Sequence, residues 1–322
     1  MDLEELILHY YLKIFNFFII IFIIFFSLTF YYSINKKNIV KKEIFSIQKQ
    51  QKIESIFKQN LEHISYLDIL FIKTYYHLNY FLFNKYIHYG DFKVSQYVSV
   101  IDLFKIISKP SNVLSKITIV EGWSKIQLYE ELSKYFYEFD NIPYEEILAD
   151  TYYFDKNIGF ESFVKNLKKV KSDYFFDYKN NNLYQSFSEE EIITIGSLLE
   201  KEGINFEDKK SISSVIFNRL IKNMKLQIDA TVLYAITDGK YNLGRKLLFN
   251  DLKFDDPYNT YIYRGLPPKP ISYVGKKTLD IVFKNHKSEF LFYFFDNSLN
   301  RHKFSKTYKE HKAKLDEYRK NQ

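Results

Sequence analysis

The stretch Ser188–Ile204, with the sequence SEEEIITIGSLLEKEGI, decides how the larger part of this chain folds. It predicts one short helix, because Ser188 and Glu191 have the spacing of a capping box at its start. We expect Gly203 to end the helix in a left-handed conformation. Apolar residues recur at helical spacing on one face, which we expect to be buried: Ile192, Ile195 and Leu199.

Glu200 lies beside this apolar face, one turn after Gly196. A carboxyl at the edge of an apolar surface is desolvated and keeps its proton more readily, so it can donate that proton to a leaving oxygen. Gly196 costs the helix about 1 kcal/mol relative to alanine and leaves room for a close approach. The alternative is a solvated Glu200 at a Glu/Lys-rich helix end, and the helix taken alone favours that alternative.

The composition indicates a folded protein of about two domains. The chain has 322 residues, of which 46% are hydrophobic and 26% charged. The absence of cysteine excludes disulfides, thiol catalysis and cysteine-based zinc sites. The net charge of +7 fits an anionic membrane or polymer, but the charges form no dense block that would indicate nucleic acid. The seven histidines form no ligand cluster and no glycine-rich phosphate loop is present, so we expect no metal and no cofactor.

A run without charged side chains predicts a single transmembrane helix at residues 14–34, after a cytoplasmic segment at residues 1–13. A cleaved signal peptide is the alternative, but the run is longer than a usual signal core and no cleavage site follows it. One lysine precedes the run and four follow it closely. By the positive-inside rule this pattern would place the rest of the chain in the cytoplasm.

The remaining chain predicts an α+β protein with a spacer and small module at residues 35–115 and a larger domain at 116–322. In the small module we expect a helical spacer at 36–58, helices at 53–79 and 99–108, and a strand and turn at 86–100. In the larger domain we expect a strand at 117–120, helices at 125–136, 209–222 and 273–284, and a hairpin at 290–305. We also expect Asp208 to cap the helix at 209–222, and Thr307 with Glu310 to cap the last helix.

The segment DPYNTYIYRGLPPKPI at residues 256–271 shows neither helical nor strand periodicity. Its prolines predict a stiff loop, and its tyrosine, asparagine and threonine side chains predict a site wall rather than a linker. Asp229 precedes a helical run, where a helix cap is the favoured interpretation. Asp150 is predicted either to cap a turn or to point a carboxylate into a cleft.

Five blocks in this order resemble the YceG-like (MltG) family of membrane-anchored endolytic murein transglycosylases: LLEKEG at 198–203, VIFNRL at 215–220, MKLQIDATVLYAI at 224–236, PYNTYIYRGLPPKPI at 257–271 and HKFSKTYKEH at 302–311. The resemblance covers residues from about 117 to the C-terminus and includes the upstream anchor. Residues 53–110 resemble, more weakly, the LysM-like subdomain of the same proteins.

The resemblance implies a lyase that cuts peptidoglycan glycan strands between N-acetylmuramic acid and N-acetylglucosamine and leaves 1,6-anhydro ends. The family's catalytic acid is taken to fall on Glu200 and not on Glu202. One carboxyl suffices for this reaction, because the C6 hydroxyl of the sugar is the nucleophile and gains the advantage of proximity. Ordinary glycosidases need two carboxyl groups.

The resemblance also implies a set of groove residues that bind sugar hydroxyl and acetamido groups: Asn218, Gln227, Asp229, Tyr258, Asn259, Thr260, Tyr261 and Asp150. Gly265, Pro267 and Pro268 would fix the loop. The chain departs from the family at Ala149, where a proline is expected before Asp150, which leaves the loop geometry there open.

The implied partners are peptidoglycan strands, the cytoplasmic membrane and cell-wall synthases, with the large domain outside the cytoplasm despite the charge pattern. Two alternatives stay open. One is a non-catalytic anchored glycan-binding scaffold. The other is a muramidase that uses water, which would need Asp150 or Asp229 as a second carboxylate.

Overall fold

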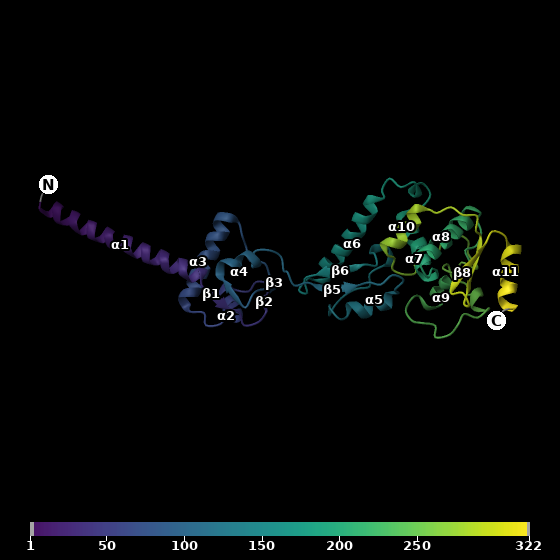
Figure 1. Ribbon diagram of the computed structural model, residues 1–322, viewed down its shortest axis with the longest axis horizontal. Coiled ribbons are helices and arrows are strands. Elements are labelled where there is room, and N and C mark those ends of the chain that lie inside the picture. Colours follow the sequence, from purple (N-terminus) through teal and green to yellow (C-terminus); the bar gives the residue numbers. More distant parts are fainter. Residues whose placement is uncertain (1–2, 321–322) are drawn as a thin grey trace. The chain divides into compact units, whose positions relative to one another are not determined.

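The computed structural model describes residues 3–320, so residues 1–2 of the predicted cytoplasmic segment and 321–322 of the predicted catalytic domain lie outside the described residues. Helices and strands both contribute to the fold, which is mixed α+β as predicted (Figure 1). The chain forms two compact units. The first contains the chain up to Ser115 together with Phe154–Asn157, and the second contains Lys116–Tyr153 and the chain from Ile158 onward.

The first unit is built from helices and two short antiparallel strand pairs. Its elements are α1 (Leu3–Asn35), β1 (Lys37–Ile39), β2 (Ile44–Ile47), α2 (Ile53–Asn60), α3 (Tyr66–Phe83), β3 (Gly90–Lys93), β4 (Tyr97–Ser99) and α4 (Val100–Ile107). Strand β1 pairs with β4, and β2 pairs with β3. Aromatic side chains fill the core between them: Phe45, Phe57, Phe92 and Phe104.

The predicted helical spacer at residues 36–58 is wrong. Strands β1 and β2 occupy its first part, and only α2 at its end is helical. The lysine and glutamine content suggested a helix, but Phe45 and Ile47 are buried while Ile44 and Ser46 are exposed, which is the alternation of a half-buried strand. Pairing with β3 therefore overrides the local helix propensity in this segment.

Helix α1 contains the predicted membrane span. It is long and apolar enough to cross a bilayer by length and composition, and its span is not covered by the rest of the protein. Its last turns pack against the first unit, where Phe26 and Phe30 contact the ring of Phe71 edge to face at 5.4 and 5.6 Å. The Ser33 hydroxyl donates a hydrogen bond of 2.7 Å to Asp68. The helix is thus fixed to the module that follows it.

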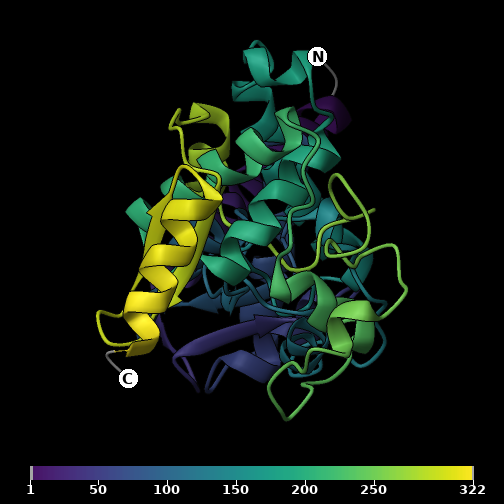
Figure 2. The ribbon, with the colours of Figure 1, turned by 90° about the vertical axis from the view of Figure 1, so that its right-hand side faces the viewer.

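The second unit contains most of β5 (Ser115–Thr118) and β6 (Thr151–Phe154), which pair with each other. Its helices are α5 (Lys125–Leu132), α6 (Phe160–Asp177), α7 (Glu189–Glu202), α8 (Phe206–Ile221), α9 (Asp229–Thr237), α10 (Lys276–Lys284) and α11 (Tyr308–Lys320). The predicted hairpin is confirmed as β7 (Phe292–Asp296) and β8 (Arg301–Ser305). Figure 2 shows α11 lying over this hairpin.

Helix α7 is the centre of the second unit. The predicted capping box is present, since the Ser188 side chain accepts from Glu191 N–H at 3.2 Å and the Glu191 carboxylate accepts from Ser188 N–H at 2.7 Å. The left-handed end at Gly203 is wrong, because its φ is −86°. The predicted apolar face is fully buried, and α8 and α10 pack on the helix.

Gly196 permits the contact between α7 and α10. A Cβ atom at Gly196 would lie 2.7 Å from Val274 and 3.1 Å from Leu279. We therefore expect Gly196→Ala to lower the free energy of unfolding by about 1–3 kcal/mol despite its better helix propensity. The double variant Gly196→Ala/Val274→Ala relieves the clash and should regain stability in thermal unfolding. A single variant as stable as the wild type would contradict this packing role.

Two predicted helix caps are corrected. Helix α8 begins at Phe206 and is capped by Asn205, whose side chain accepts from Asp208 N–H at 3.0 Å. The Asp208 carboxylate instead pairs with His302. Asp229 is the first residue of α9 and makes no capping hydrogen bond from its side chain. The cap of the last helix is confirmed, because the Thr307 hydroxyl accepts from Glu310 N–H at 3.2 Å.

Candidate active site

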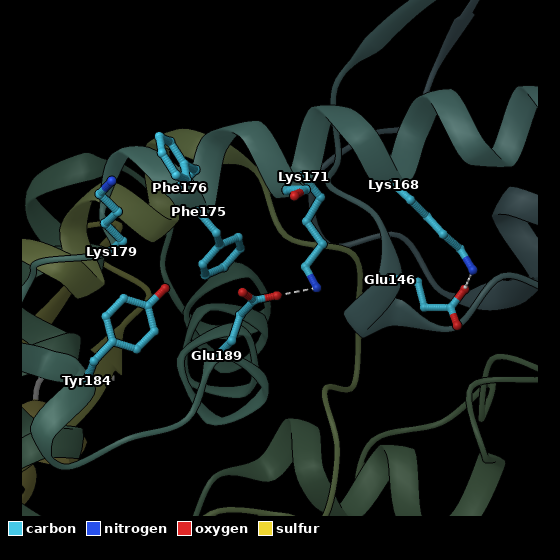
Figure 3. A pocket seen from close by; sticks show the side chains of 9 residues that line it. Glu146, Lys168, Lys171, Phe175, Phe176, Lys179, Tyr184 and Glu189 are labelled. Atoms are coloured by element: carbon cyan, nitrogen blue, oxygen red, sulfur yellow. Dashed lines mark ion pairs between the residues drawn. The ribbon is translucent and has the colours of Figure 1, made fainter.

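A shallow groove of about 590 Å³ runs along α6 (Figure 3). Two of its lysines are paired with glutamates of the same groove, Lys168 with Glu146 at 2.7 Å and Lys171 with Glu189. None of the predicted site residues lines it. The groove therefore supports none of the predicted site residues, several of which lie near the end of α7.

Two carboxyl groups leave the last turn of α7 in different directions. Glu200 and Glu202 are two residues apart, which corresponds to about 200° around a helix. Glu202 lies three residues after Leu199, on the same helix face as the buried Ile192 and Ile195. Glu200 lies four residues after Gly196, on the face that packs against α10. Their surroundings differ accordingly.

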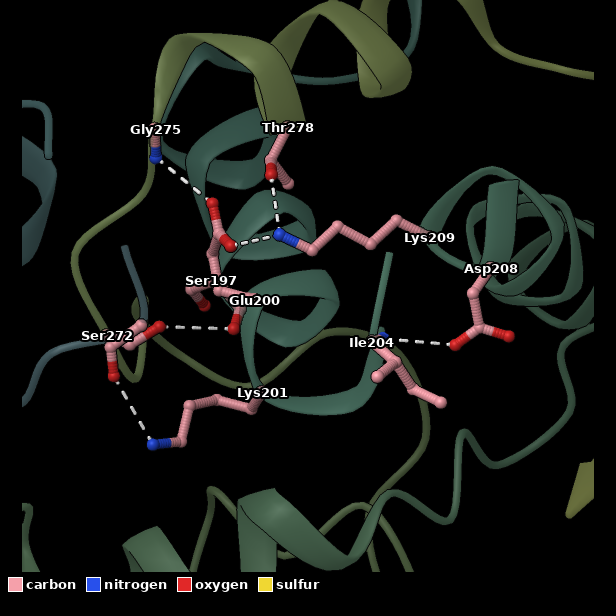
Figure 4. Close-up of polar contacts among 10 residues, drawn as sticks. Ser197, Glu200, Lys201, Ile204, Asp208, Lys209, Ser272, Gly275 and Thr278 are labelled. Atoms are coloured by element: carbon pink, nitrogen blue, oxygen red, sulfur yellow. Dashed lines mark hydrogen bonds and ion pairs between the residues drawn. The ribbon is translucent and has the colours of Figure 1, made fainter. Parts of the chain in front are cut away.

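The carboxylate of Glu200 is bound on both oxygens within the protein (Figure 4). Its side chain is 2% exposed and forms an ion pair with Lys209. The other oxygen accepts from Gly275 N–H at 3.1 Å, and Lys209 also donates to the Thr278 hydroxyl at 3.0 Å. Glu200 thereby joins α7, α8 and the start of α10, and the catalytic role that the sequence suggested for it stays a prediction.

Glu202 is a partly exposed residue whose carboxyl lies in desolvated surroundings. Burial raises its pKa from the ordinary 4.5 to about 7, against the hydrogen bond that the Tyr293 hydroxyl donates at 3.1 Å. The negative charges of Asp229 and Asp208 raise this pKa further, whereas the backbone N–H of Ala230 lowers it. A carboxyl with this pKa still carries a proton near neutral pH, as a general acid requires.

Tyrosines and carboxylates from three segments surround Glu202. The Tyr261 hydroxyl donates a hydrogen bond of 2.5 Å to the exposed Asp229, and burial raises the pKa of Tyr261 and of Tyr293. Arg219 is buried and donates to the Leu291 carbonyl at 2.7 Å. Its positive charge acts on both tyrosines. The site thus combines one neutral acid with hydroxyl groups and one exposed carboxylate.

A contact between His302 and Asp208 supports the ring of Tyr293. His302 Nδ1 lies 2.8 Å from Asp208, and its ring meets the Tyr293 ring edge to face at 5.3 Å. Asp208 also accepts from Ile204 N–H at 3.1 Å, which fixes the chain just after α7. The conformation of Tyr293 beside Glu202 is therefore held by contacts from α8 and β8.

Three of the predicted groove residues make contacts inside the protein. The Asn218 amide donates to the carbonyls of Ser288 and Phe290 at 2.8 and 2.9 Å. Asn259 is buried, and its amide donates to two carbonyls of its own loop at 3.1 and 2.7 Å. Thr260 is buried against Thr231, at 2.9 Å between the hydroxyls. These side chains hold the loop and the strand in place, while their predicted contacts with sugar stay predictions.

The other residues of the predicted groove lie on the loop and before α9. Gln227 is exposed with a left-handed φ of 51°, and its N–H donates to the Thr260 carbonyl at 3.1 Å. Tyr258 packs on Tyr234 with ring centroids 4.7 Å apart. Gly265 has a φ of 87°, which favours glycine, and is followed by the buried Pro267 and the exposed Pro268. The segment is an irregular loop, as predicted, while its stiffness stays a prediction.

Asp150 lies on the Glu200 side of α7. Its carboxylate pairs with Lys276 at 2.8 Å, and the preceding Ala149 forms a bridge with Gly275, whose N–H binds Glu200. The carboxylates whose charges act on Glu202 are Asp229 and, to a smaller extent, Asp208. In the described part of the chain, no group of three or more His, Asp or Glu side chains is arranged to hold a metal ion.

From the sequence we assigned the acid to Glu200 and not to Glu202, and gave no role in the site to Tyr293 or Arg219. For Glu202 a signal was present, because it falls on the helical interval of the buried stripe. For Tyr293 and Arg219 no comparable signal exists, since both reach the site through the packing of α8 and β7 against α7 and α9.

Relatives of known type match parts of the chain. The chain is 37% identical over 164 residues to an endolytic murein transglycosylase of Bacillus subtilis (strain 168). The aligned segment covers 51% of this chain and 44% of that protein. An endolytic murein transglycosylase of Streptococcus pneumoniae (serotype 2, strain D39) is 30% identical over 175 residues. This alignment covers 52% of this chain and 31% of that protein. The chain thus spans less than half the length of these relatives.

The fold has a counterpart among solved structures. A yceG-like protein from Listeria monocytogenes superposes with a TM-score of 0.54 at 23% identity, covering 86% of this chain and 99% of that one. The family model described as YceG-like matches residues 45–317, most of the chain and both of its units. The chain belongs to the YceG-like family.

Proposed function

We propose that this protein is an endolytic murein transglycosylase that cuts peptidoglycan glycan strands and leaves 1,6-anhydro ends, with Glu202 as the acid. The observation that carries the proposal is the position of Glu202, whose carboxyl is bound by the Tyr293 hydroxyl in desolvated surroundings that raise its pKa to about 7, near the exposed Asp229. Relatives named endolytic murein transglycosylase support the reaction class.

Glu202 suits the two steps of this reaction better than Glu200. In the first step the protonated Glu202 gives its proton to the glycosidic oxygen as the bond to C1 breaks. In the second step the resulting carboxylate takes the proton of the C6 hydroxyl as that oxygen bonds to C1. Glu200 is 2% exposed and binds Lys209 and Gly275 N–H with its two oxygens, so a substrate oxygen would have to compete with these contacts.

The neighbours of Glu202 have roles that follow from their contacts. Tyr293 holds the carboxyl in place through its hydrogen bond. Asp229, exposed and bound by Tyr261, is placed to accept from a sugar hydroxyl and keeps Glu202 protonated through its charge. Asp229 is also the second carboxylate that a muramidase using water would need, so the products must decide between the two reactions.

The test is product analysis with the full-length protein in detergent on purified peptidoglycan. Anhydro-ended fragments, identified by mass spectrometry, would support the lytic reaction. Reducing ends would instead support the muramidase with Asp229 as the second carboxylate. Glycan binding without any product would support the non-catalytic scaffold.

The pH dependence of the reaction should report on Glu202. The acid form is required, so the rate should fall as the pH rises through about 7. Tyr293→Phe removes a hydrogen bond that lowers the pKa of Glu202, so the pH at which the rate falls should rise. Asp229→Asn removes a negative charge that raises the pKa of Glu202, so the pH at which the rate falls should decrease. Rate profiles of the three proteins would check both signs, and shifts in the same direction would contradict the assignment.

We also propose that α1 anchors the protein in the cytoplasmic membrane with the second unit on the outer side, where peptidoglycan lies. Cell-wall synthases are the expected protein partners. The first unit is proposed to be a LysM-like module that binds glycan. Protease accessibility of the second unit in intact cells and in spheroplasts would test this orientation.

A further inference from the structure

Helix α3 in the first unit has two apolar faces. One face is buried in the core through Ile69 and Ile72. The other carries large exposed apolar side chains in two groups at helical spacing, one at each end of the helix, separated by the buried Phe71 and by Thr74: Leu67 and Leu70, then Leu78, Phe81 and Leu82. We call these five residues the stripe. Phe81 is 86% exposed. A stripe of this size on the surface of a protein unit indicates a partner.

The stripe contains no charged side chain. The two charged residues of α3 are used inside the unit, Asp68 in an ion pair of 2.6 Å with Lys36 and Lys73 in one of 2.8 Å with Glu54. Against burial, hydrogen bonds from Lys36, Ser65 and Ser33 lower the pKa of Asp68 to about 2, so this pair is ionised at neutral pH. Apart from Thr74 and His77, the outward face of the helix is left apolar and aromatic.

The end of α1 places this stripe at the level of a membrane. The uncharged run of α1 begins after Lys13, and about 20 residues are needed to cross a bilayer, so the span must extend to about Ser33. Phe26 and Phe30 therefore lie within the span, and both contact Phe71 of α3. The start of α3 is consequently held beside the end of the span, within about two helical turns of the membrane surface.

We propose that α3 lies in the membrane interface and that its outward stripe contacts lipid, as a second membrane contact beside α1. Figure 1 shows α3 crossing the end of α1 instead of continuing along it. Tyr66 and Tyr80 on the same helix and Lys85 just after it are residue types enriched at the membrane–water interface. Two contacts would fix the first unit against rotation about α1. The inference rests on the proposed anchoring by α1.

The absence of cysteine in the chain allows a direct test. The full-length single-cysteine variants Phe81→Cys, Phe22→Cys and Ile44→Cys are labelled with a polarity-sensitive fluorophore. They are reconstituted in vesicles of phosphatidylcholine and phosphatidylglycerol, with and without lipids that carry a doxyl quencher. Phe22 reports on α1, and Ile44, 41% exposed on β2, is an apolar control in the same unit.

We expect blue-shifted emission and loss of emission to the doxyl lipids at Phe81→Cys and Phe22→Cys, and neither at Ile44→Cys. If the label at Phe22→Cys is quenched but the label at Phe81→Cys is quenched no more than the control at Ile44→Cys, the inference would be overturned. The proposed anchoring by α1 would still stand. No quenching at Phe22→Cys would overturn the anchoring itself. A blue shift at Phe81→Cys without quenching, growing with the protein-to-lipid ratio, would show that a second copy covers the stripe, and would also overturn the inference.

Discussion

Replacing Glu202 by glutamine should reduce the formation of anhydro-ended products by about 10²–10⁴-fold, which is the contribution typical of a general acid. Glutamine keeps the shape and the hydrogen bond from Tyr293 but has no proton to give at neutral pH. The measurement is the initial rate of product release from purified peptidoglycan at pH 6, below the pKa of Glu202.

The same variant should be more stable than the wild type at alkaline pH. The folded-state pKa of about 7 lies above the ordinary 4.5, so protonation favours the folded state at low pH and this stability is lost as the pH rises through 7. At about 1.4 kcal/mol per pH unit, the ionised carboxylate costs the fold about 3 kcal/mol at pH 8. Glu202→Gln should therefore raise Tm at pH 8, with a gap that shrinks toward pH 5. If Glu202→Gln lost activity and was also less stable than the wild type at pH 8, this would argue that Glu202 is not held in its neutral form.

Replacing Glu200 by glutamine should have the opposite effects: stability should fall and activity should be largely kept. It leaves Lys209, which is largely buried, without its carboxylate, and breaking a buried ion pair typically costs about 3–5 kcal/mol. We expect a marked loss of Tm, with most of the activity per folded molecule retained below that Tm. Thermal unfolding and product assays on the same preparation would measure both.

The matched control is the double variant Glu200→Gln/Lys209→Met, which removes the unpaired charge as well. It should recover much of the lost stability, because replacing both partners of a buried ion pair is often close to neutral. If Glu200→Gln instead abolished product formation while Tm stayed unchanged, Glu200 would be the acid and the assignment of Glu202 would be overturned.

The sequence by itself determined the elements whose signals are local. Ser188 and Glu191 carry a capping box that depends only on residues three apart, and it is present in α7. The hairpin of β7 and β8 and the apolar run of α1 were likewise readable from short-range patterns. The ordered blocks from residue 198 onward indicated the family, which the match over residues 45–317 shows.

Only the tertiary structure decided which glutamate at the end of α7 is paired with a lysine and which is bound by a tyrosine hydroxyl. Glu200 and Glu202 are the same residue type two positions apart, and local sequence gives both the same helix end. Lys209 comes from α8 and Gly275 from before α10, whereas Tyr293 comes from β7. The free energy of ionising a carboxyl depends on the solvent and charges within a few ångströms of it, and these are set by packing between elements far apart in the chain.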